Sequence, residues 1–139
     1  MSRKIEDAMS RQVRWCDATA TLKEAHDLMS RYAIRHLLIQ DKSTGKLAGI
    51  LSDRDVKKFV SPFAVAASAS ERDKATLNVE VGKVMVKNIV TAKAGDKVSS
   101  VLDMMMQKKI SAIPIVDDDH KAIGIFTTTD AMKLLITLL

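Results

Sequence analysis

The chain has 139 residues, of which 47% are hydrophobic, 28% charged and 4% aromatic, and its formal net charge is +5. This composition is typical of about one globular domain and excludes a disordered chain, which needs few apolar residues and a large net charge. The single cysteine, Cys16, excludes a scaffold of intrachain disulfides and favours a reducing, cytoplasmic location. The longest apolar run, 134–139, is far shorter than the roughly 18 residues of a membrane span, so we expect none.

The sequence contains an internal repeat. It matches itself at an offset of 76 residues, which becomes 75 after one residue is deleted in a loop. The matched pairs include Met9 with Met85, Asp27 with Asp103, Ile39 with Ile115, Gly49 with Gly124 and Asp55 with Asp130. Such self-similarity predicts two copies of one structural unit. We place the first copy at residues 1–60, a linker at 61–80 and the second copy at 81–139.

The first copy predicts a strand, a helix, a two-stranded hairpin and a second helix. Thr21 and Glu24 have the spacing of a capping box, in which a hydroxyl and a carboxylate satisfy free amides at a helix start. Apolar residues then recur three and four positions apart over 22–29, which indicates one buried helix face. The short apolar runs 36–39 and 47–51 flank a polar turn and predict the hairpin.

The second copy repeats these signals, with strands expected at 112–116 and 122–126. The fold class is therefore α+β (α/β), with two strand-helix-strand-strand-helix repeats packed in pseudo-two-fold symmetry. A unit of about 55 residues is marginal for folding alone, so we expect the copies to pack on each other. In the linker, the small-residue segment 61–70 includes Ser61–Pro62, which also fits the start of a short helix.

Three motifs occur in both copies, in the same order. They are an opening that ends in Met (Ile5–Met9 and Val81–Met85), a segment that leads into the hairpin (Ile34–Ile39 and Ile110–Ile115), and a Gly-apolar-apolar-Ser/Thr-x-x-Asp string (Gly49–Asp55 and Gly124–Asp130). With these motifs the chain resembles a tandem pair of CBS domains, also called a Bateman module. The resemblance covers nearly the whole chain.

The resemblance implies a regulatory module without catalysis. Its relatives bind AMP, ADP, ATP or S-adenosylmethionine in the clefts between paired domains and associate into flat homodimers of four CBS units. By this resemblance Asp55 and Asp130 hold ribose hydroxyls, and Ser52 and Thr127 contact phosphate. The other positions that match ligand contacts in the family are Arg35 and His36 for phosphate, Leu38, Ile39, Pro114 and Ile115 for the base, and Thr91 in the first strand.

The two copies depart from the family pattern in different places. The first copy has Trp15 where the second has Thr91, and Leu38 where the second has Pro114, which alters or narrows the pocket that it opens. The second copy has Ser111–Ala112 in place of Arg35–His36, so its phosphate contacts would have to come from elsewhere.

Residue chemistry alone leaves alternatives open. The strings Ser52-x-x-Asp55 and Thr127-x-x-Asp130 also fit a capping box, and one side chain can serve both roles. The three aspartates 117–119 lack the alternation and the central glycine of a calcium loop, so a hairpin turn is favoured over a metal site. Cys16 has no partner for a metal site and is interpreted as a small hydrophobic residue.

Other function classes compete with the nucleotide-sensing hypothesis. No nucleophile elbow, P-loop or metal-ligand cluster is recognisable, so we expect no catalytic residues and no metal. The basic surplus would also suit a module that binds nucleic acid, although aromatic residues for base stacking are scarce. A third reading is a purely structural dimerisation module with degenerate pockets. The regulated protein partner is unknown.

Overall fold

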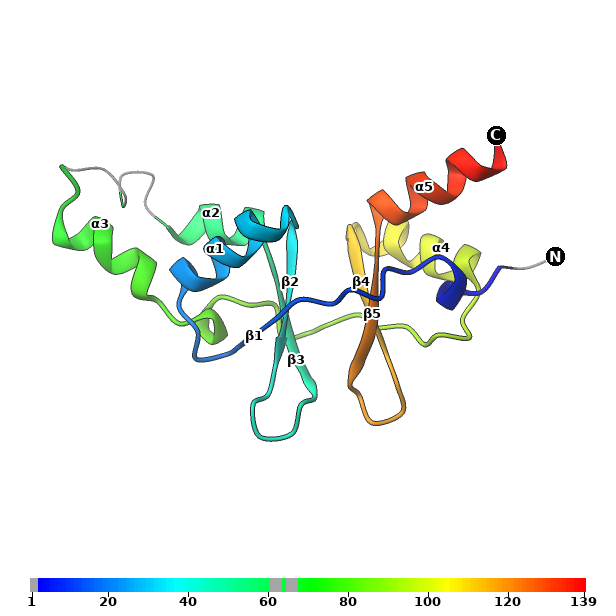
Figure 1. Ribbon diagram of the computed structural model, residues 1–139, viewed down its shortest axis with the longest axis horizontal. Helices are drawn as coiled ribbons and strands as arrows, with labels where there is room; N and C mark the ends of the chain where they lie inside the picture. Colours follow the sequence, from blue (N-terminus) through cyan, green and yellow to red (C-terminus); the bar gives the residue numbers. More distant parts are fainter. Residues whose placement is uncertain (1–2, 61–63, 65–67) are drawn as a thin grey trace. The chain divides into compact units, whose positions relative to one another are not determined.

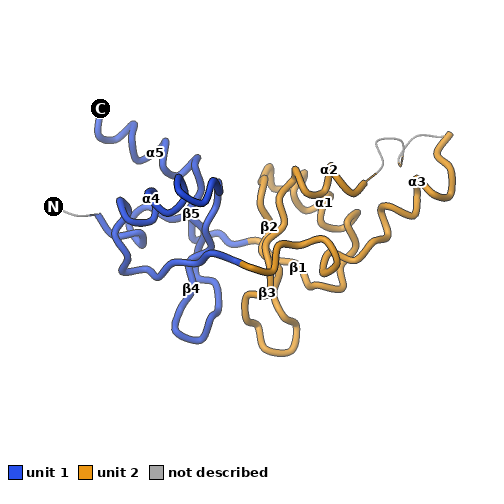
Figure 2. Tube along the Cα trace, turned by 180° about the vertical axis from the view of Figure 1, so that it is seen from behind, with its two compact units in different colours: residues 1–13, 89–139 blue, residues 14–88 orange. Residues whose placement is uncertain are grey.

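The structure is a computed structural model that describes residues 3–60, 64 and 68–139. These residues divide into two compact units (Figures 1 and 2). Unit 2 is the continuous stretch 14–88, whereas unit 1 combines residues up to 13 with residues 89–139. The helix start predicted at Ser61–Pro62 lies outside the described residues.

Unit 2 contains the elements predicted for the first copy, in the predicted order. They are β1 (Trp15–Asp17), α1 (Leu22–Tyr32), β2 (His36–Gln40), β3 (Leu47–Ser52) and α2 (Asp53–Phe59). The sheet order is β1-β2-β3, with β1 parallel and β3 antiparallel to β2. Thr21 Oγ1 accepts a hydrogen bond from Glu24 N at 3.2 Å, which confirms the hydroxyl half of the predicted helix start. Within the predicted linker, the chain forms α3 (Glu71–Ala75) and η2 (Thr76–Asn78), and η3 (Val81–Lys83) follows.

The core of unit 2 lies between α1, α2 and one face of its sheet. The buried members are Leu22, Ala25 and Met29 of α1, Leu37 and Ile39 of β2, Leu51 of β3, Val56 of α2 and Val81 of η3. Because side chains alternate along a strand, His36, Leu38, Ile50 and Ser52 lie on the opposite face of this sheet. That opposite face carries the residues that the family resemblance singles out.

Unit 1 has the same plan with one difference. Its elements are η1 (Ile5–Asp7), α4 (Val98–Lys108), β4 (Ala112–Val116), β5 (Ala122–Thr127) and α5 (Thr128–Leu138). The first strand predicted for the second copy is reduced to a one-residue parallel bridge, in which Ala92 N donates to Pro114 O at 3.1 Å. The strand is this short because a turn begins at Lys93, whose N–H donates to the Asp96 carboxylate at 2.9 Å.

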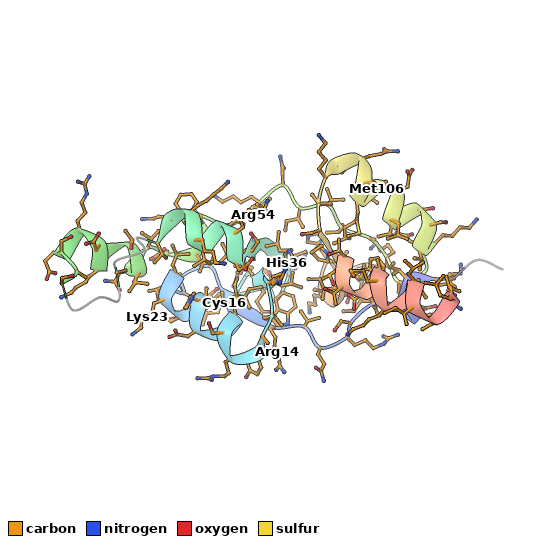
Figure 3. The ribbon with its side chains drawn as sticks, turned by 90° about the horizontal axis from the view of Figure 1, so that it is seen from above. Arg14, Cys16, Lys23, His36, Arg54 and Met106 are labelled. Atoms are coloured by element: carbon orange, nitrogen blue, oxygen red, sulfur yellow. The ribbon has the colours of Figure 1, made fainter. Side chains whose placement is uncertain are left out.

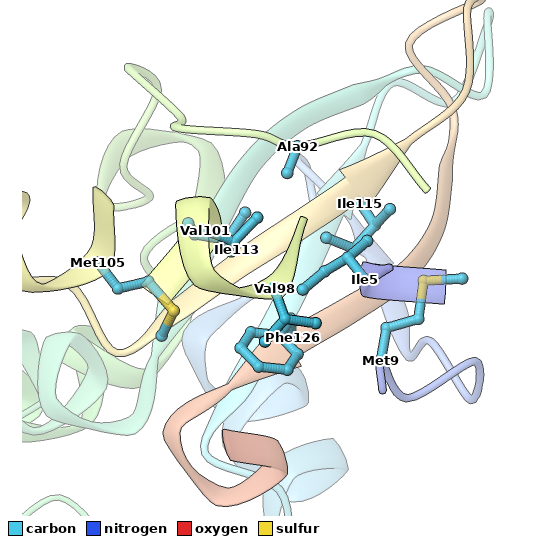
Figure 4. Close-up of a cluster of buried hydrophobic side chains, with 9 residues drawn as sticks. All are labelled: Ile5, Met9, Ala92, Val98, Val101, Met105, Ile113, Ile115 and Phe126. Carbon is cyan, nitrogen blue, oxygen red and sulfur yellow. The ribbon is translucent and has the colours of Figure 1, made fainter. Parts of the chain in front are cut away.

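The opening segment of each sequence copy packs on the other copy's core. In unit 1, Ile5 and Met9 join a cluster otherwise built from residues 92–126, as the close-up in Figure 4 shows. Ser10 and Ile125 exchange two backbone hydrogen bonds of 2.9 Å. In unit 2, Val86 and Ile50 make the corresponding exchange at 2.9 and 3.1 Å. The boundaries of the compact units therefore differ from those of the predicted repeats, 1–60 and 81–139. The repeat boundaries themselves stay a prediction.

Helices α1 and α4 end alike. Each is followed by a residue in the left-handed conformation, Ala33 with φ of 52° and Lys109 with φ of 55°. This conformation is usual after a helix but is one that glycine adopts most easily. No helix in the described ranges has both the length and the apolar character needed to cross a bilayer.

Candidate functional site

Both hydroxyl-x-x-Asp strings sit where a strand passes directly into a helix, and both form capping boxes. Thr127 ends β5 and caps α5, because its Oγ1 accepts from Asp130 N at 3.3 Å and its N–H donates to Asp130 Oδ2 at 2.9 Å. Ser52 and Asp55 make the same pair of bonds at the start of α2, both at 3.1 Å. The capping interpretation is therefore confirmed in both copies.

Capping leaves part of each carboxylate open. In the described structure, the hydrogen bonds to Asp55 and Asp130 all go to the Oδ2 oxygens. Each Oδ1 therefore accepts no hydrogen bond from the described residues, and it lies beside the first turn of a helix, where free amides and the positive end of the helix dipole lie. A neutral diol could donate to this oxygen without breaking the cap.

The sheet of unit 1 gathers the residues predicted for the second copy on one face. Ala92 belongs to the core and pairs with Ile115, and extending the strand alternation one residue beyond this single bridge assigns Thr91 to the opposite face, next to Pro114. The strand register continues this face across the sheet, because Pro114 pairs with Ile125 and Ala112 with Thr127. We call this surface the Thr91 face, and its members are Thr91, Ala112, Pro114, Ile125 and Thr127.

The sheet of unit 2 has an equivalent surface, which we call the Trp15 face. Its members are Trp15, His36, Leu38, Ile50 and Ser52. Trp15 pairs with Leu38, and Leu38 pairs with Ile50. His36 pairs with Ser52 at the end of the sheet where α2 begins. Trp15, Ala112, Ile50 and Ile125 are missing from the predicted contacts, although strand register and alternation would place them there.

The first copy brings its predicted phosphate contacts to the start of α2. Arg35 is exposed, and its carbonyl oxygen accepts from Asp53 N at 2.9 Å. His36 is half-buried beside it, and Figure 3 labels it together with Arg54 of α2. Burial is the main cause that lowers the pKa of His36, against the attraction of Asp53 and Asp55, which raises it. His36 is therefore neutral at pH 7.

The side chains of two predicted base contacts point into the cores, away from the sheet faces that carry Ser52 and Thr127. The side chains of Ile39 and Ile115 are fully buried in the cores of their units. Leu38 and Pro114 are also buried but belong to neither core cluster. Adjacent residues of a strand face opposite sides, so Leu38 and Pro114 share the faces of Ser52 and Thr127. A ligand contact at Ile39 or Ile115 stays a prediction and is restricted to the main chain.

Other reactive side chains have structural roles. Cys16 packs against the core of unit 2, and burial, followed by the charges of Asp17 and Glu24, raises its pKa to about 12. It is a protonated thiol, as its interpretation as a hydrophobic residue predicts. Within the described ranges, no three His, Cys, Asp or Glu residues gather in a way that would hold a metal ion.

The acidic loop between β4 and β5 is a hairpin turn. Asp117 Oδ1 accepts hydrogen bonds from Asp119 N and Lys121 N, both at 2.9 Å. The bond from Lys121 is the main reason that the pKa of Asp117 is lowered. The carboxylate closes the turn, which confirms the turn interpretation of residues 117–119.

Known proteins resemble the chain along most of its length. An uncharacterized protein of Methanocaldococcus jannaschii, MJ1225, is 30% identical over 130 residues, and a homoserine O-acetyltransferase of Methanosphaera stadtmanae is 30% identical over 131 residues. These matches cover 93% and 94% of this chain but only 46% and 24% of the relatives. The chain thus spans half or less of these two proteins.

A solved structure resembles the whole chain. The crystal structure of the CBS domain pair of protein MJ0100, in complex with 5'-methylthioadenosine and S-adenosyl-L-methionine, has a TM-score of 0.82 and 26% identity, and the match covers 100% of both chains. The family model of the CBS domain matches twice, at residues 5–62 and 81–137. This chain therefore belongs to the CBS domain family and consists of a tandem pair of CBS domains.

Proposed function

We propose that this CBS pair is a non-catalytic regulatory module that binds an adenosine-containing ligand, either AMP, ADP, ATP or S-adenosylmethionine. The observation that carries the proposal is the arrangement at the start of α5. Asp130 keeps one carboxylate oxygen open there, beside the hydroxyl of Thr127 and at the end of the Thr91 face. The MJ0100 pair, 26% identical, supports it because that protein is in complex with two adenosine compounds.

The chemistry of the ligand fits this arrangement. A ribose diol offers two hydroxyl donors to one carboxylate, and a hydrogen bond to a charged group contributes about 1.5–3 kcal/mol. Amides of the first helical turn and the Thr127 hydroxyl suit a polar group attached to the sugar. A ligand that binds one conformation of the module better than another would shift the population toward it, which is how such a module would regulate a partner.

Thermal unfolding with each nucleotide tests the proposal. We expect one of AMP, ADP, ATP or S-adenosylmethionine to stabilise the protein by about 2.7 kcal/mol at one hundred times its dissociation constant. In a domain of this size the midpoint would rise by about 5–15 °C. If none of them shifts the midpoint, the proposal fails, and DNA binding at two salt concentrations then separates a nucleic-acid module from a purely structural one.

A matched pair of variants separates ligand contact from helix capping. Asp130→Ala should weaken adenosine-ligand binding about ten- to hundredfold while the protein still folds. Asp73 provides the control, because with Ser70 it forms the same capping box at the start of α3. Asp73→Ala should lower stability similarly and leave the affinity unchanged. If both variants lose only stability, Asp130 is a cap and nothing more.

We also infer that two chains associate through α5. Three apolar residues of α5 and the residue that follows the helix form an exposed stripe at helical spacing, namely Met132, Leu135, Ile136 and Leu139, with exposed fractions of 64%, 55%, 70% and 97%. The sequence predicts Leu134, Leu135 and Leu138 for such an interface. Leu138 is also exposed, whereas Leu134 lies on the other side of the helix and packs against the core of unit 1. The proposed partner of the stripe is the same stripe on a second copy of the chain, since two apolar surfaces complement each other.

The cytoplasmic location also stays a prediction.

A further inference from the structure

The positive charge of the chain is concentrated in unit 2. Residues 14–88 include thirteen Lys and Arg side chains against nine Asp and Glu, whereas the residues of unit 1 include nine against eight. Most of the net charge of +5 therefore belongs to unit 2. The short helix α2 carries three of its cations close together, namely Arg54, Lys57 and Lys58.

These three cations form one exposed helix face. Lys57 and Lys58 follow Arg54 by three and four positions, a spacing that places side chains on the same side of a helix. All three residues are exposed, whereas Val56 on the other side of α2 is buried in the core of unit 2. Arg54 is labelled on α2 in Figure 3. We call Arg54, Lys57 and Lys58 the α2 basic face.

The stability of the helix explains only part of this face. Lys57 and Lys58 lie in the last turn, where the negative end of the helix dipole favours cations, and Lys57 Nζ lies 3.8 Å from Asp53 Oδ2. Arg54 lies in the first turn, beside the positive end of the dipole, where a cation is unfavourable. Among the described residues Arg54 has no ion-pair partner. A residue that breaks a local rule in this way points to a role outside the helix.

The equivalent helix of unit 1 presents a different surface. Counted from the residue that caps each helix, Thr129 of α5 takes the place of Arg54, and Met132 takes the place of Lys57. Met132 belongs to the exposed apolar stripe of α5. The two equivalent helices thus offer surfaces of different chemistry, which suit different partners.

A second copy of the chain is a poor partner for the α2 basic face. Two such faces repel each other, and contact with the α5 stripe would bury three cations against apolar side chains. The acidic loop 117–119 does not complement the face either, because two of its carboxylates are already engaged. Asp117 closes the turn, and Asp118 Oδ1 lies 3.2 Å from Lys93 Nζ.

Nucleic acid also fits the size of the face badly. A protein that binds DNA with a steep salt dependence contacts roughly 6–10 phosphates spread along the duplex. Helix α2 has seven residues and offers three cations within about one turn. A short acidic stretch of polypeptide matches this area, because carboxylates three or four positions apart have the same spacing as the three cations.

We propose that the α2 basic face binds an acidic segment of another protein. The Arg54 guanidinium holds one carboxylate through two parallel hydrogen bonds, and Lys57 and Lys58 attract others as point charges. Because these side chains are exposed, the contact is weak and sensitive to salt. The proposal goes beyond the binding of an adenosine compound and does not depend on it.

Fluorescence anisotropy of a labelled poly-glutamate peptide, titrated with the full chain, tests the proposal. Wild type should bind the peptide, and added salt should weaken the binding. The variant Arg54→Gln/Lys58→Gln should weaken it about tenfold. Lys42→Gln/Lys46→Gln is the matched control, because it removes the same charge from exposed positions of unit 2 outside α2. The control should keep the wild-type affinity.

A single substitution separates binding from folding. Arg54→Gln should weaken peptide binding and at the same time raise the midpoint of thermal unfolding, because it removes a cation from the positive end of the dipole. A lower midpoint with unchanged binding would make Arg54 a structural residue and overturn the proposal.

The titrations have three further outcomes that would overturn the proposal. One is a wild-type chain that does not bind the peptide, and another is equal weakening in the control, which would show that net charge alone attracts it. The third is a DNA duplex that binds more tightly than the peptide and is released in Arg54→Gln/Lys58→Gln, which would assign the face to nucleic acid.

Discussion

Met9 lies directly over Gly124. A Cβ atom at position 124 would stand 2.6 Å from Met9 Sδ and 2.8 Å from the carbonyl oxygen of Ser10. Met85 covers Gly49 in the same way in unit 2. In both units the glycine lets an opening segment approach the sheet closely enough to pair with its edge, at Ser10 in one unit and at Val86 in the other.

Because of this contact, even a methyl side chain at position 124 should destabilise the protein. Gly124→Ala should lower the free energy of unfolding by about 1–3 kcal/mol, because a methyl group in this packed place forces the backbone of residues 9–10 to move. Urea unfolding measures the change. Gly95→Ala is the control, since nothing lies within 4 Å of a Cβ atom there, and its effect should be small. A Gly124→Ala protein as stable as wild type would show that the segment adjusts freely.

The left-handed residue after α4 predicts a stabilising substitution. Lys109→Gly should raise the free energy of unfolding by about 1 kcal/mol, because glycine adopts this conformation without the strain of a Cβ atom. The adjacent change Lys108→Gly falls on the last residue of the helix and should lower it, by less than the roughly 1 kcal/mol that glycine costs in a helix interior. Two glycine substitutions side by side thus have opposite expected signs in one denaturation experiment. Equal losses from both would contradict the conformational argument.

His36 predicts a pH dependence of stability. Because its pKa is lowered in the folded protein, the unfolded chain binds the proton more readily in the interval below the ordinary value of about 6.5. The histidine thus stabilises the fold fully above this value, and the contribution is lost as the pH falls toward the folded pKa. His36→Gln should therefore flatten the fall in unfolding free energy between about pH 7 and pH 5.

An exposed histidine serves as the comparison for that measurement. The side chain of His26 on α1 has an exposed fraction of 62%. The variant His26→Gln should keep the slope of the wild-type protein. If His36→Gln and wild type have the same slope, burial of His36 does not contribute to stability.

The stripe on α5 predicts a change of oligomeric state. Leu135→Glu should convert the proposed dimer to a monomer, because a charge would be buried against an apolar partner surface. Light scattering after size-exclusion chromatography measures the mass. Thr137→Glu introduces the same charge at an exposed position of α5 on the side of the helix away from the stripe, and should leave the dimer intact. A monomeric wild-type chain would contradict the inference.

Much of each unit follows from local sequence patterns. The capping residues Thr21, Ser52 and Thr127 mark three helix starts, and the polar turns of both hairpins separate strands where the alternating pattern stops. The weak point is the first strand of the second copy. It consists of Ala92 alone, because the hydrogen bond from Lys93 N to the Asp96 carboxylate begins a turn directly after it. The pattern of apolar residues does not predict this turn.

The candidate site is predictable where it depends on register. His36 and Ser52 are brought together by the hairpin, as are Ala112 and Thr127. The prediction that Pro114 and Ile115 both flank a base neglects alternation, since Ile115 belongs to the core. In contrast, the packing of residues 3–13 on the second copy could not be predicted from the sequence. Ile5 and Val81 look alike in sequence, and only tertiary contacts decide which core each one joins.

The division of the chain into units has a consequence for the order in which they form. Unit 2 is continuous, so all of its contacts are available once Asn88 has left the ribosome. Unit 1 needs Ile5 and Met9 to meet residues as distant in sequence as Phe126. Closing so long a loop carries an entropic cost that is paid before the contacts form, so unit 1 is expected to fold more slowly. During synthesis the apolar side chains around Ile5 therefore stay exposed until the remaining residues of their core have been synthesised.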